Sequence, residues 1–470
     1  MTLESLQLTA KQQECVDYKG EHLLVRGVAG SGKTTVLLKR ARKHLEESKG
    51  AKIQLFTFNR TLAKYARSLA SYIDPHAIKA DHFHGWAKPV LQSLNIQIRH
   101  VKYPKKVIKD CLEALEKAKP YRLYKESTKF WEEEFSWMKG RQLLTLEDYL
   151  KADRKGRGAS VRVTMEDRPY IFQAFEKYQQ KLKSMKAVDF DDYALLLLQN
   201  FDRIPKGAFM DHILIDEAQD LHEAQMKIMR KLSLKSMTIA ADKAQKIYKT
   251  TFAWKDIGIN IRGKGSKFLN NSFRSTKQII ELARSIQQSD PLFDENDEEY
   301  LPSVTPDVEG TIPSVFYLKD RLHEDEFVVE LIKKSIEEDN EQTIGLLSRF
   351  WEDLNRFQEE LQKHGIESEI IRDEEGDVLT PGVKLTTFHS AKGLEFDTVI
   401  LTRLENKILP YISRRQELDD EYLSTERKLF YVSMTRAKHL LYMTCGGREP
   451  SPFFDQMNRN LYRLKRLEKL

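Results

Sequence analysis

Apolar and polar positions follow two different periods along the first part of the chain. The apolar run EHLLVRG at 21–27 ends in glycine and predicts a strand, and the residues that follow it have the spacing of an amphipathic helix. A second strand is predicted at 52–58, KIQLFTF. From 88 to 204 the segments are charged and have helical spacing. Strand-like segments occur again at 211–216 (DHILID) and 237–242 (MTIAAD). We therefore expect 88–204 to be a helical insertion into an α/β domain.

The second half of the chain has a strand set of its own. Its predicted strands are SVFYL (314–318), TIGLL (343–347), SEIIR (368–372), VKLTTF (383–388), TVILT (398–402) and HLLYMT (439–444). Helical stretches separate most of them, and this alternation is typical of parallel sheets. The acidic, proline-containing stretch at 290–310 predicts an exposed loop or hairpin. The sequence thus predicts two α/β lobes: 1–87 with 205–276 forms the first, 88–204 is inserted into it, and 277–470 forms the second.

Composition indicates a soluble, globular chain that needs no covalent staples. The chain has 470 residues, of which 40% are hydrophobic and 31% charged. Cys15, Cys111 and Cys445 lie far apart, which excludes a disulfide framework and a paired-cysteine metal site. The apolar run at 193–198 is too short to cross a bilayer, and the N-terminus has no secretory h-region. We expect a cytoplasmic protein with no membrane partner.

Charge is more informative in its distribution than in its total. The net charge is 77 − 71 = +6, but residues 88–188 hold 23 Lys and Arg against 13 Asp and Glu, a local excess of 23 − 13 = +10. A basic block of this kind is typical of a nucleic-acid footprint. A solvated helical surface gives the same pattern, so charge alone leaves both readings open.

The string GVAGSGKT at 27–34 has the G-x-x-x-x-G-K-[ST] pattern of a phosphate-binding loop, between a strand and a helix. Lys33 is placed to reach the β- and γ-phosphates of a nucleotide, and Thr34 to offer its hydroxyl to Mg²⁺. Backbone N–H groups at the helix N-terminus would surround the phosphates. The residues that form this cradle are Gly27, Gly30, Ser31 and Gly32.

Two carboxylates follow the apolar strand at 213–215. Asp216 is placed to hold Mg²⁺ through its water shell, and Glu217 to orient and deprotonate the attacking water. Together with the upstream phosphate loop they indicate a nucleoside-triphosphatase. The long gap between the two motifs excludes small nucleotide kinases, whose domain is compact.

From these motifs onward, the whole chain resembles the UvrD/Rep-like superfamily 1 DNA helicases. The matching strings are LTAKQ (8–12), FTFNRTLA (56–63), HFHGWA (82–87), VDFDDYALLL (188–197), ADKAQKIY (241–248), NSFRST (271–276), TTFHSAKGLEFDTVIL (386–401) and ERKLFYVSMTRAKHLL (426–441). The resemblance implies two RecA-like P-loop lobes with a largely helical insertion, called 1B, in the first. It also implies ATP and Mg²⁺ as cofactors.

The resemblance assigns roles at the nucleotide site to residues outside the phosphate loop. Gln12 would read the adenine, Gln245 would sense the phosphate and Glu395 would hold the ribose. Arg274 and Arg436 would reach the γ-phosphate from the second lobe, where an arginine stabilises charge on the transferred phosphoryl group.

Two positions beside the base depart from the family pattern. Phe273 stands where the family usually has a tyrosine stacked on the adenine, and stacking needs only the ring face. Thr35 replaces the arginine that often follows the loop threonine, so one side of the adenine clamp is expected to be weaker. The usual asparagine before the aromatic is Ser272.

Other motif positions predict contacts to single-stranded DNA. They are Phe56, Phe58, Asn59, His84, Tyr248, Trp254 and His389. In the family a tryptophan after the phosphate-sensing motif stacks on a base, but here Thr250 occupies that position. Phe252 or Trp254 would replace it, and the alternative that both are core residues stays open.

The largest departure concerns a subdomain called 2B, which UvrD-like helicases carry before the HSAKG string. Only about ten residues lie between the strand ending near 373 and the next beginning at 383, so 2B is predicted to be absent or vestigial. The wording HSAKGLEF at 389–396 favours the branch associated with 3′→5′ translocation.

The resemblance therefore predicts an ATP-dependent 3′→5′ helicase or translocase acting on single-stranded DNA and 3′-tailed duplex. The missing 2B subdomain favours an alternative, a DNA-sensing regulatory ATPase that gates a partner nuclease, for example in phage defence. A nucleotide-binding module without chemistry is a third possibility, and the intact set of catalytic residues argues against it.

Overall fold

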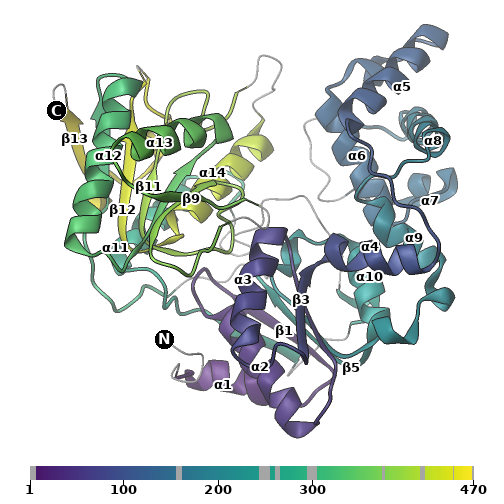
Figure 1. Ribbon diagram of the computed structural model, residues 1–470. Coiled ribbons are helices and arrows are strands. Elements are labelled where there is room, and N and C mark those ends of the chain that lie inside the picture. The colour runs from purple at the N-terminus through teal and green to yellow at the C-terminus, as the bar shows by residue number, and fades with distance from the viewer. Residues whose placement is uncertain are drawn as a thin grey trace.

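The computed structural model describes residues 7–154, 161–242, 254–259, 265–293, 304–372, 376–412, 419–447 and 449–467. Two lobes, each built on a parallel sheet, lie beside one another, and a helical block rises from the first lobe (Figure 1). The predicted fold class, two α/β lobes with parallel sheets, is confirmed.

The first lobe has a six-stranded sheet in the order β3-β2-β4-β5-β1-β6, and every pairing is parallel. Its strands are β1 (His22–Gly27), β2 (Ile53–Thr57), β3 (Ile78–His82), β4 (Met210–Ile215), β5 (Ser233–Ala241) and β6 (Ser266–Leu269). β2 is buried at all its positions, as expected for a strand covered by helices on both faces. The apolar pattern of the sequence did not predict β3 and β6, which are short edge strands.

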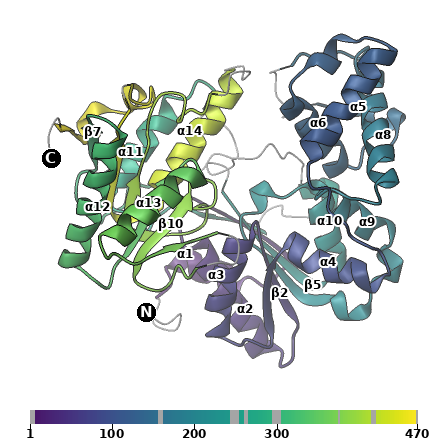
Figure 2. The same ribbon diagram turned by 45° about the horizontal axis from the view of Figure 1, so that its top comes forward.

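Helices cover both faces of this sheet (Figures 1 and 2). They are α1 (Ala10–Asp17), α2 (Lys33–Glu47), α3 (Arg60–Ser71), α4 (Phe83–Ser93), α9 (Asp192–Gln199) and α10 (Glu223–Leu232). Short 3-10 helices occur at η2 (Arg122–Lys125), η3 (Phe201–Arg203), η4 (Lys206–Ala208), η5 (Ala218–Asp220), η7 (Trp254–Ile257), η9 (Phe454–Gln456) and η10 (Arg459–Leu461).

The helical insertion has a hydrophobic core of its own, which runs from Val101 to Ala187 and surrounds the fully buried Trp131. Its helices are α5 (Pro104–Ala118), α6 (Thr128–Gly140), α7 (Leu146–Lys151) and α8 (Arg168–Ser184). Leu91 of α4 and Leu197 of α9 instead belong to the first-lobe core. The independent core is therefore shorter than the predicted 88–204 segment.

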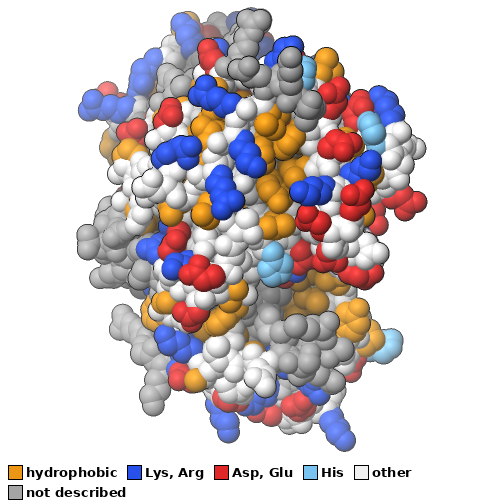
Figure 3. All heavy atoms as spheres, turned by 90° about the vertical axis from the view of Figure 1, so that its left-hand side faces the viewer, with side chains coloured by type: hydrophobic (Ala, Val, Ile, Leu, Met, Phe, Trp, Pro, Cys, Tyr) orange, Lys and Arg blue, Asp and Glu red, His pale blue; other side chains and the backbone are white. Residues whose placement is uncertain are grey.

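The second lobe has a seven-stranded parallel sheet in the order β13-β7-β12-β11-β8-β10-β9. Its strands are β7 (Ser314–Leu318), β8 (Thr343–Ser348), β9 (Ser368–Ile370), β10 (Gly382–Thr387), β11 (Phe396–Leu401), β12 (Ala437–Cys445) and β13 (Arg463–Leu467). Its helices are α11 (Lys277–Gln288), α12 (Arg321–Glu338), α13 (Trp351–Lys363) and α14 (Asp420–Met434). The basic edge strand β13 was not predicted from the sequence. Basic and acidic side chains are interspersed with hydrophobic ones on this side of the molecule (Figure 3).

The two lobes meet through the start of α3. Leu62, on the first lobe, packs into the hydrophobic core of the second. Gly393 faces it with a φ of +82°, and a Cβ there would lie 2.2 Å from the Leu62 side chain. Glycine is thus required at 393 both for backbone conformation and for space.

Residues 371–381 are all that connect the neighbouring parallel strands β9 and β10, at the place where 2B is predicted to be missing. The carbonyl of Gly376 in this link accepts a hydrogen bond from the Lys64 ammonium on α3. The link therefore contacts the first lobe directly. Among the helices described, none is long and apolar enough to cross a membrane.

Candidate functional site

The phosphate loop follows β1 and ends as α2 begins. Gly30 and Gly32 have φ of +71° and +78°, in the left-handed region where glycine is favoured. The Lys33 ammonium donates to the loop carbonyls of Gly27 (2.7 Å) and Val28 (3.1 Å) and lies 3.6 Å from an Asp242 carboxylate oxygen. The lysine is thus held against the loop that would surround the phosphates.

Two buried hydroxyls beside this loop have no protein partner. Ser31 Oγ and Ser272 Oγ make no hydrogen bond among the described residues, although both side chains are buried. A buried polar group without a partner is costly, and a phosphate oxygen would satisfy it. The cradle therefore fits a bound phosphate.

The two predicted carboxylates emerge at the carboxyl end of β4. Thr34 Oγ1 donates a hydrogen bond of 2.6 Å to Asp216 Oδ2, which joins the loop to the acidic pair. Burial, with the neighbouring Glu217 charge, raises the pKa of Asp216 to about 6. A divalent cation held by Thr34 and Asp216 would relieve that cost, so these residues fit the predicted Mg²⁺.

Glu217 lies in a different electrostatic setting from its neighbour. Burial alone would raise its pKa, but Lys392, Lys33 and Arg436 outweigh burial and lower it. Lys392 comes from the second lobe, and its ammonium lies 3.9 Å from Glu217 Oε2. The predicted base is therefore kept ionised by cations of both lobes.

The two predicted arginines reach this place from segments that follow β6, the last strand of the first-lobe sheet, in the chain. A Cβ on Gly30 would lie 2.6 Å from Arg274 Cβ, so Arg274 is beside the phosphate loop. Its Nε donates to Glu395 Oε2 at 2.8 Å. Arg436 is fully buried and donates to the carbonyls of Val432 (2.8 Å) and Leu394 (3.1 Å).

Arg436 is electrostatically strained by its surroundings. Burial and the neighbouring Arg274 charge lower its pKa to about 9, while Glu217 and Glu395 act in the opposite direction. An anionic phosphate in this place would stabilise both guanidinium groups.

The predicted adenine side of the site consists of the first turn of α1 and the segment before α11. Gln12 is buried and its amide Nε2 donates to Ser31 O at 3.0 Å, while its Oε1 accepts from Thr9 N. Phe273 is 56% exposed, and its N–H donates to Gly30 O at 2.8 Å. Thr35 lies in the first turn of α2. An exposed aromatic ring anchored to the phosphate loop is suited to stacking on a base.

The predicted DNA residues of the first lobe gather at the carboxyl edge of its sheet. Phe58 follows directly after β2, and Asn59 caps α3 by accepting from Leu62 N at 2.8 Å. His84, at the start of α4, has its Nε2 3.1 Å from Phe190 O. His389 lies after β10 of the second lobe.

His84 belongs to an aromatic cluster that was not predicted from the sequence. The Phe190 ring is 54% exposed, with its centroid 5.0 Å from that of His84 and 3.9 Å from that of His100. Tyr103, three residues after His100, is 60% exposed, and the Lys102 ammonium lies 5.3 Å from its ring centroid. Exposed rings next to cations are the elements of a single-strand binding surface.

The structure corrects one predicted DNA contact and leaves others outside the described residues. Phe56 is 1% exposed and packs edge-on against Trp86, so its ring is not available to DNA. Trp254 is partly buried against the first-lobe core, in agreement with the alternative that it is a core residue. Gln245 and Tyr248 lie outside the described residues.

The basic insertion also contains cations that are not free. Arg154 is ion-paired with the fully buried Glu134 and donates to Tyr149 OH at 3.0 Å. It supports the insertion core and is not an exposed phosphate contact. Lys102, Lys105 and Lys106, around the start of α5, are exposed instead.

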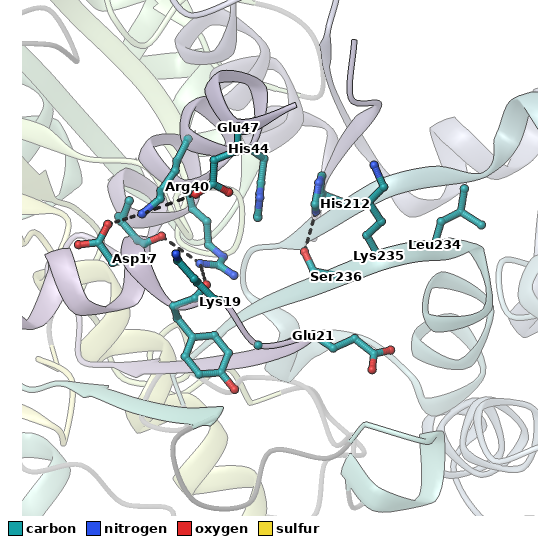
Figure 4. Close-up of a pocket in the computed structure, with 14 residues that line it drawn as sticks. Asp17, Lys19, Glu21, Arg40, His44, Glu47, His212, Leu234, Lys235 and Ser236 are labelled. Carbon is teal, nitrogen blue, oxygen red and sulfur yellow. Dashed lines mark hydrogen bonds and ion pairs between the residues drawn. The ribbon is translucent and has the colours of Figure 1, made fainter. Parts of the chain in front are cut away.

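A hollow of about 610 Å³ lies in the first lobe at the amino ends of the strands, whereas the phosphate loop lies at their carboxyl ends. Figure 4 shows the His44 ring facing that of His212, with centroids 3.7 Å apart and planes at 7°. Arg40, which also lines the hollow, donates hydrogen bonds to the carbonyls of Cys15, Val16 and Tyr18. The hollow is therefore separate from the nucleotide site.

Comparisons with known proteins agree with this arrangement. A family model described as the UvrD/REP helicase N-terminal domain matches residues 8–256, and one described as the UvrD-like helicase C-terminal domain matches residues 371–446. DNA helicase IV of Escherichia coli K12 is 26% identical over 512 aligned residues, which cover 96% of this chain and 70% of that protein.

Shorter matches include the ATP-dependent DNA helicases PcrA of Staphylococcus epidermidis RP62A, 46% identical over 63 residues, and of Staphylococcus aureus Mu50, 44% identical over 63 residues. Each covers 13% of this chain and 9% of the relative.

Proposed function

Because the chain belongs to the UvrD/Rep helicase family and is an ATP-dependent DNA helicase, we propose that it moves 3′→5′ along single-stranded DNA by hydrolysing ATP between its two lobes. One observation carries the proposal. The phosphate loop and acidic pair of the first lobe lie near Arg274, Arg436 and Lys392, all from segments that follow the last strand of the first-lobe sheet.

ATP would bridge the lobes in this arrangement. Lys33 binds the phosphates from one side, and Glu217 takes the proton of the attacking water. Arg274 and Arg436 stabilise the charge that develops on the transferred phosphoryl group. Mg²⁺, when bound by Thr34 and Asp216, supplies further neutralisation of the phosphates. Hydrolysis removes the group that the arginines bind, so the lobes are expected to separate.

The DNA strand would lie across the carboxyl edges of both sheets. Phe58, His84 and Phe190 offer contacts on the first-lobe side, and His389 on the second. Aromatic stacking tolerates any base sequence, which suits a translocating enzyme. The 3′→5′ direction rests on the HSAKGLEF wording at 389–396.

The short link at 371–381 bears on how strongly the isolated chain separates duplex. In the resembling family, 2B contacts duplex and helps to set whether a monomer unwinds. We expect DNA-stimulated ATPase activity and single-strand translocation without it, but weak unwinding of long duplexes. The same link favours the alternative of a regulatory ATPase that gates a partner nuclease, which predicts ATPase activity without strand displacement.

A single-turnover unwinding assay on a 3′-tailed and a 5′-tailed duplex tests the proposal. We expect the isolated protein to open a short 3′-tailed duplex and to leave the 5′-tailed duplex closed. Opening only from the 5′ tail would refute the direction. ATPase activity that single-stranded DNA does not stimulate would refute the translocase.

A further inference from the structure

The helical insertion touches the second lobe directly. The Lys129 ammonium, in the first turn of α6, lies 4.6 Å from the centroid of the Tyr422 ring on α14. Tyr422 is 9% exposed, and its hydroxyl donates to the Tyr411 carbonyl. In Figure 2, α6 and α14 stand opposite one another above the two sheets. A fixed aromatic ring on one block therefore meets a flexible cation on the other.

The insertion is also firmly joined to the first lobe. Lys139, fully buried on α6, donates hydrogen bonds of 2.6 Å to Asp189, just before α9, and to Asp192, the first residue of α9. A Cβ on Gly140 would lie 2.8 Å from His222 Nδ1, just before α10. The α6 helix thus reaches from the first-lobe core to the second lobe.

The two lobes are joined a second time at the nucleotide site. Lys392 forms a buried ion pair with Asp220, and Leu62 packs into the second-lobe core. First lobe, insertion and second lobe therefore form a closed circuit of contacts.

His389 lies within this circuit. It lies three residues before Lys392, which forms the ion pair with Asp220 at the nucleotide site. Burial, together with the charges of Arg349 and Lys129, lowers its pKa to about 4, so Lys129 of the Lys129–Tyr422 contact lies within electrostatic reach. On the first-lobe side, the ring of His84 packs against that of Phe190. Phe190 lies just before α9, and the insertion is hydrogen-bonded to α9.

We infer that the Lys129–Tyr422 contact closes the protein over the single strand, so that one chain encircles the DNA. This inference rests on the proposed function, because it requires the strand to cross the residues named above. Encirclement keeps a translocating monomer on its strand without a 2B subdomain. Entry then requires either a free DNA end or opening at Lys129–Tyr422.

Chemical closure of this contact tests the inference. The double variant Lys129→Cys/Tyr422→Cys is joined by a flexible bis-maleimide; the three native cysteines are buried and should not react. Joined after loading, the protein should stay on circular single-stranded DNA through a high-salt wash and be lost from linear DNA. Joined before loading, it should fail to bind circles and still thread onto linear strands.

A matched pair within the insertion controls for cross-linking itself. Lys105 and Glu132 are 3.5 Å apart and both belong to the insertion, so joined Lys105→Cys/Glu132→Cys protein should leave circular DNA in the wash. Equal loss of the Lys129–Tyr422 protein from circular and linear DNA, with DNA-stimulated ATPase intact, would overturn encirclement alone. Absence of DNA stimulation in the unmodified protein would overturn the proposed function.

Single variants measure the strength of the contact. Tyr422→Ala and Lys129→Ala should each speed dissociation from single-stranded DNA by about two- to fivefold, the range for a half-exposed cation–π pair. Lys129→Arg should restore the slow rate, because a guanidinium also stacks on an aromatic ring. Restoration by Lys129→Gln as well would overturn the role of the cation.

Discussion

Lys392 and Asp220 form a buried ion pair between the two lobes, although 172 positions separate them in the chain. The same ammonium lies 3.9 Å from Glu217 Oε2 in the first lobe. A cation of the second lobe therefore helps to keep the predicted base of the first lobe ionised. Lobe contact and base ionisation are coupled through one side chain.

Removal of this cation should change the pH dependence of ATP hydrolysis. Lys392 is the leading contribution among the charges that lower the pKa of Glu217. In Lys392→Met that pKa should rise, and a base works only above its pKa, so the acid limb of the kcat profile should move to higher pH. The measurement is DNA-stimulated kcat between pH 5 and 9.

A second variant separates this effect from damage to the fold. Lys392→Met alone leaves Asp220 buried without this partner, which is strongly destabilising. Asp220→Asn/Lys392→Met removes both charges and should fold better while keeping the displaced acid limb. An unmoved acid limb in both variants would show that Lys392 does not control the base.

Arg436 should act mainly on the transition state. In Arg436→Ala we expect kcat to fall by a factor on the order of 10³, as for other arginines that contact a transferred phosphoryl group, with a much smaller loss of ATP affinity. Because Arg436 also donates hydrogen bonds to the carbonyls of Val432 and Leu394, the thermal unfolding of the Arg436→Ala protein must be measured together with its kinetics. ATP affinity that falls as far as kcat would make Arg436 a ground-state contact.

The nucleotide site could be predicted because its residues are fixed by local rules. The sequence G-x-x-x-x-G-K-T dictates a loop and a helix start, and Asp216 follows a strand that its apolar residues reveal. The contacts of Lys392 could not be predicted from spacing, because they depend on how the second lobe docks on α3.

The DNA surface was harder to predict for the same reason. Phe56 was expected to contact DNA, but β2 is covered on both faces, so the ring points into the core. Phe190 was overlooked because its exposure depends on the bridge between His100 and Val188, which are far apart in sequence. β13 could not be predicted because its sequence is highly charged and it forms a strand by pairing with β7.

Phe190 should contribute to binding of single-stranded DNA. Its exposed ring lies between His84 and His100, and loss of one stacked base costs about 1–3 kcal/mol of binding free energy. Phe190→Ala should weaken binding of all sequences alike in a fluorescence anisotropy titration. Tyr72→Ala removes a ring that is 72% exposed at the end of α3 and should leave affinity unchanged. Equal effects of the two variants would refute the stacking role.

His44 should make the first lobe sensitive to acid. It is stacked on His212, and burial lowers its pKa to about 3, whereas an unfolded chain binds this proton near pH 6.5. A depressed folded pKa gives stability that is complete above pH 6.5 and is lost as the pH falls toward 3. The loss between pH 7.5 and 5 should be on the order of 1–2 kcal/mol. His44→Phe keeps a ring against His212 but cannot take up a proton, so its thermal unfolding midpoint should fall less than that of the wild type over this interval. His76→Gln, which changes an exposed histidine of the same lobe, should behave as the wild type. If His44→Phe loses as much stability as the wild type at pH 5, the acid sensitivity arises elsewhere in the protein.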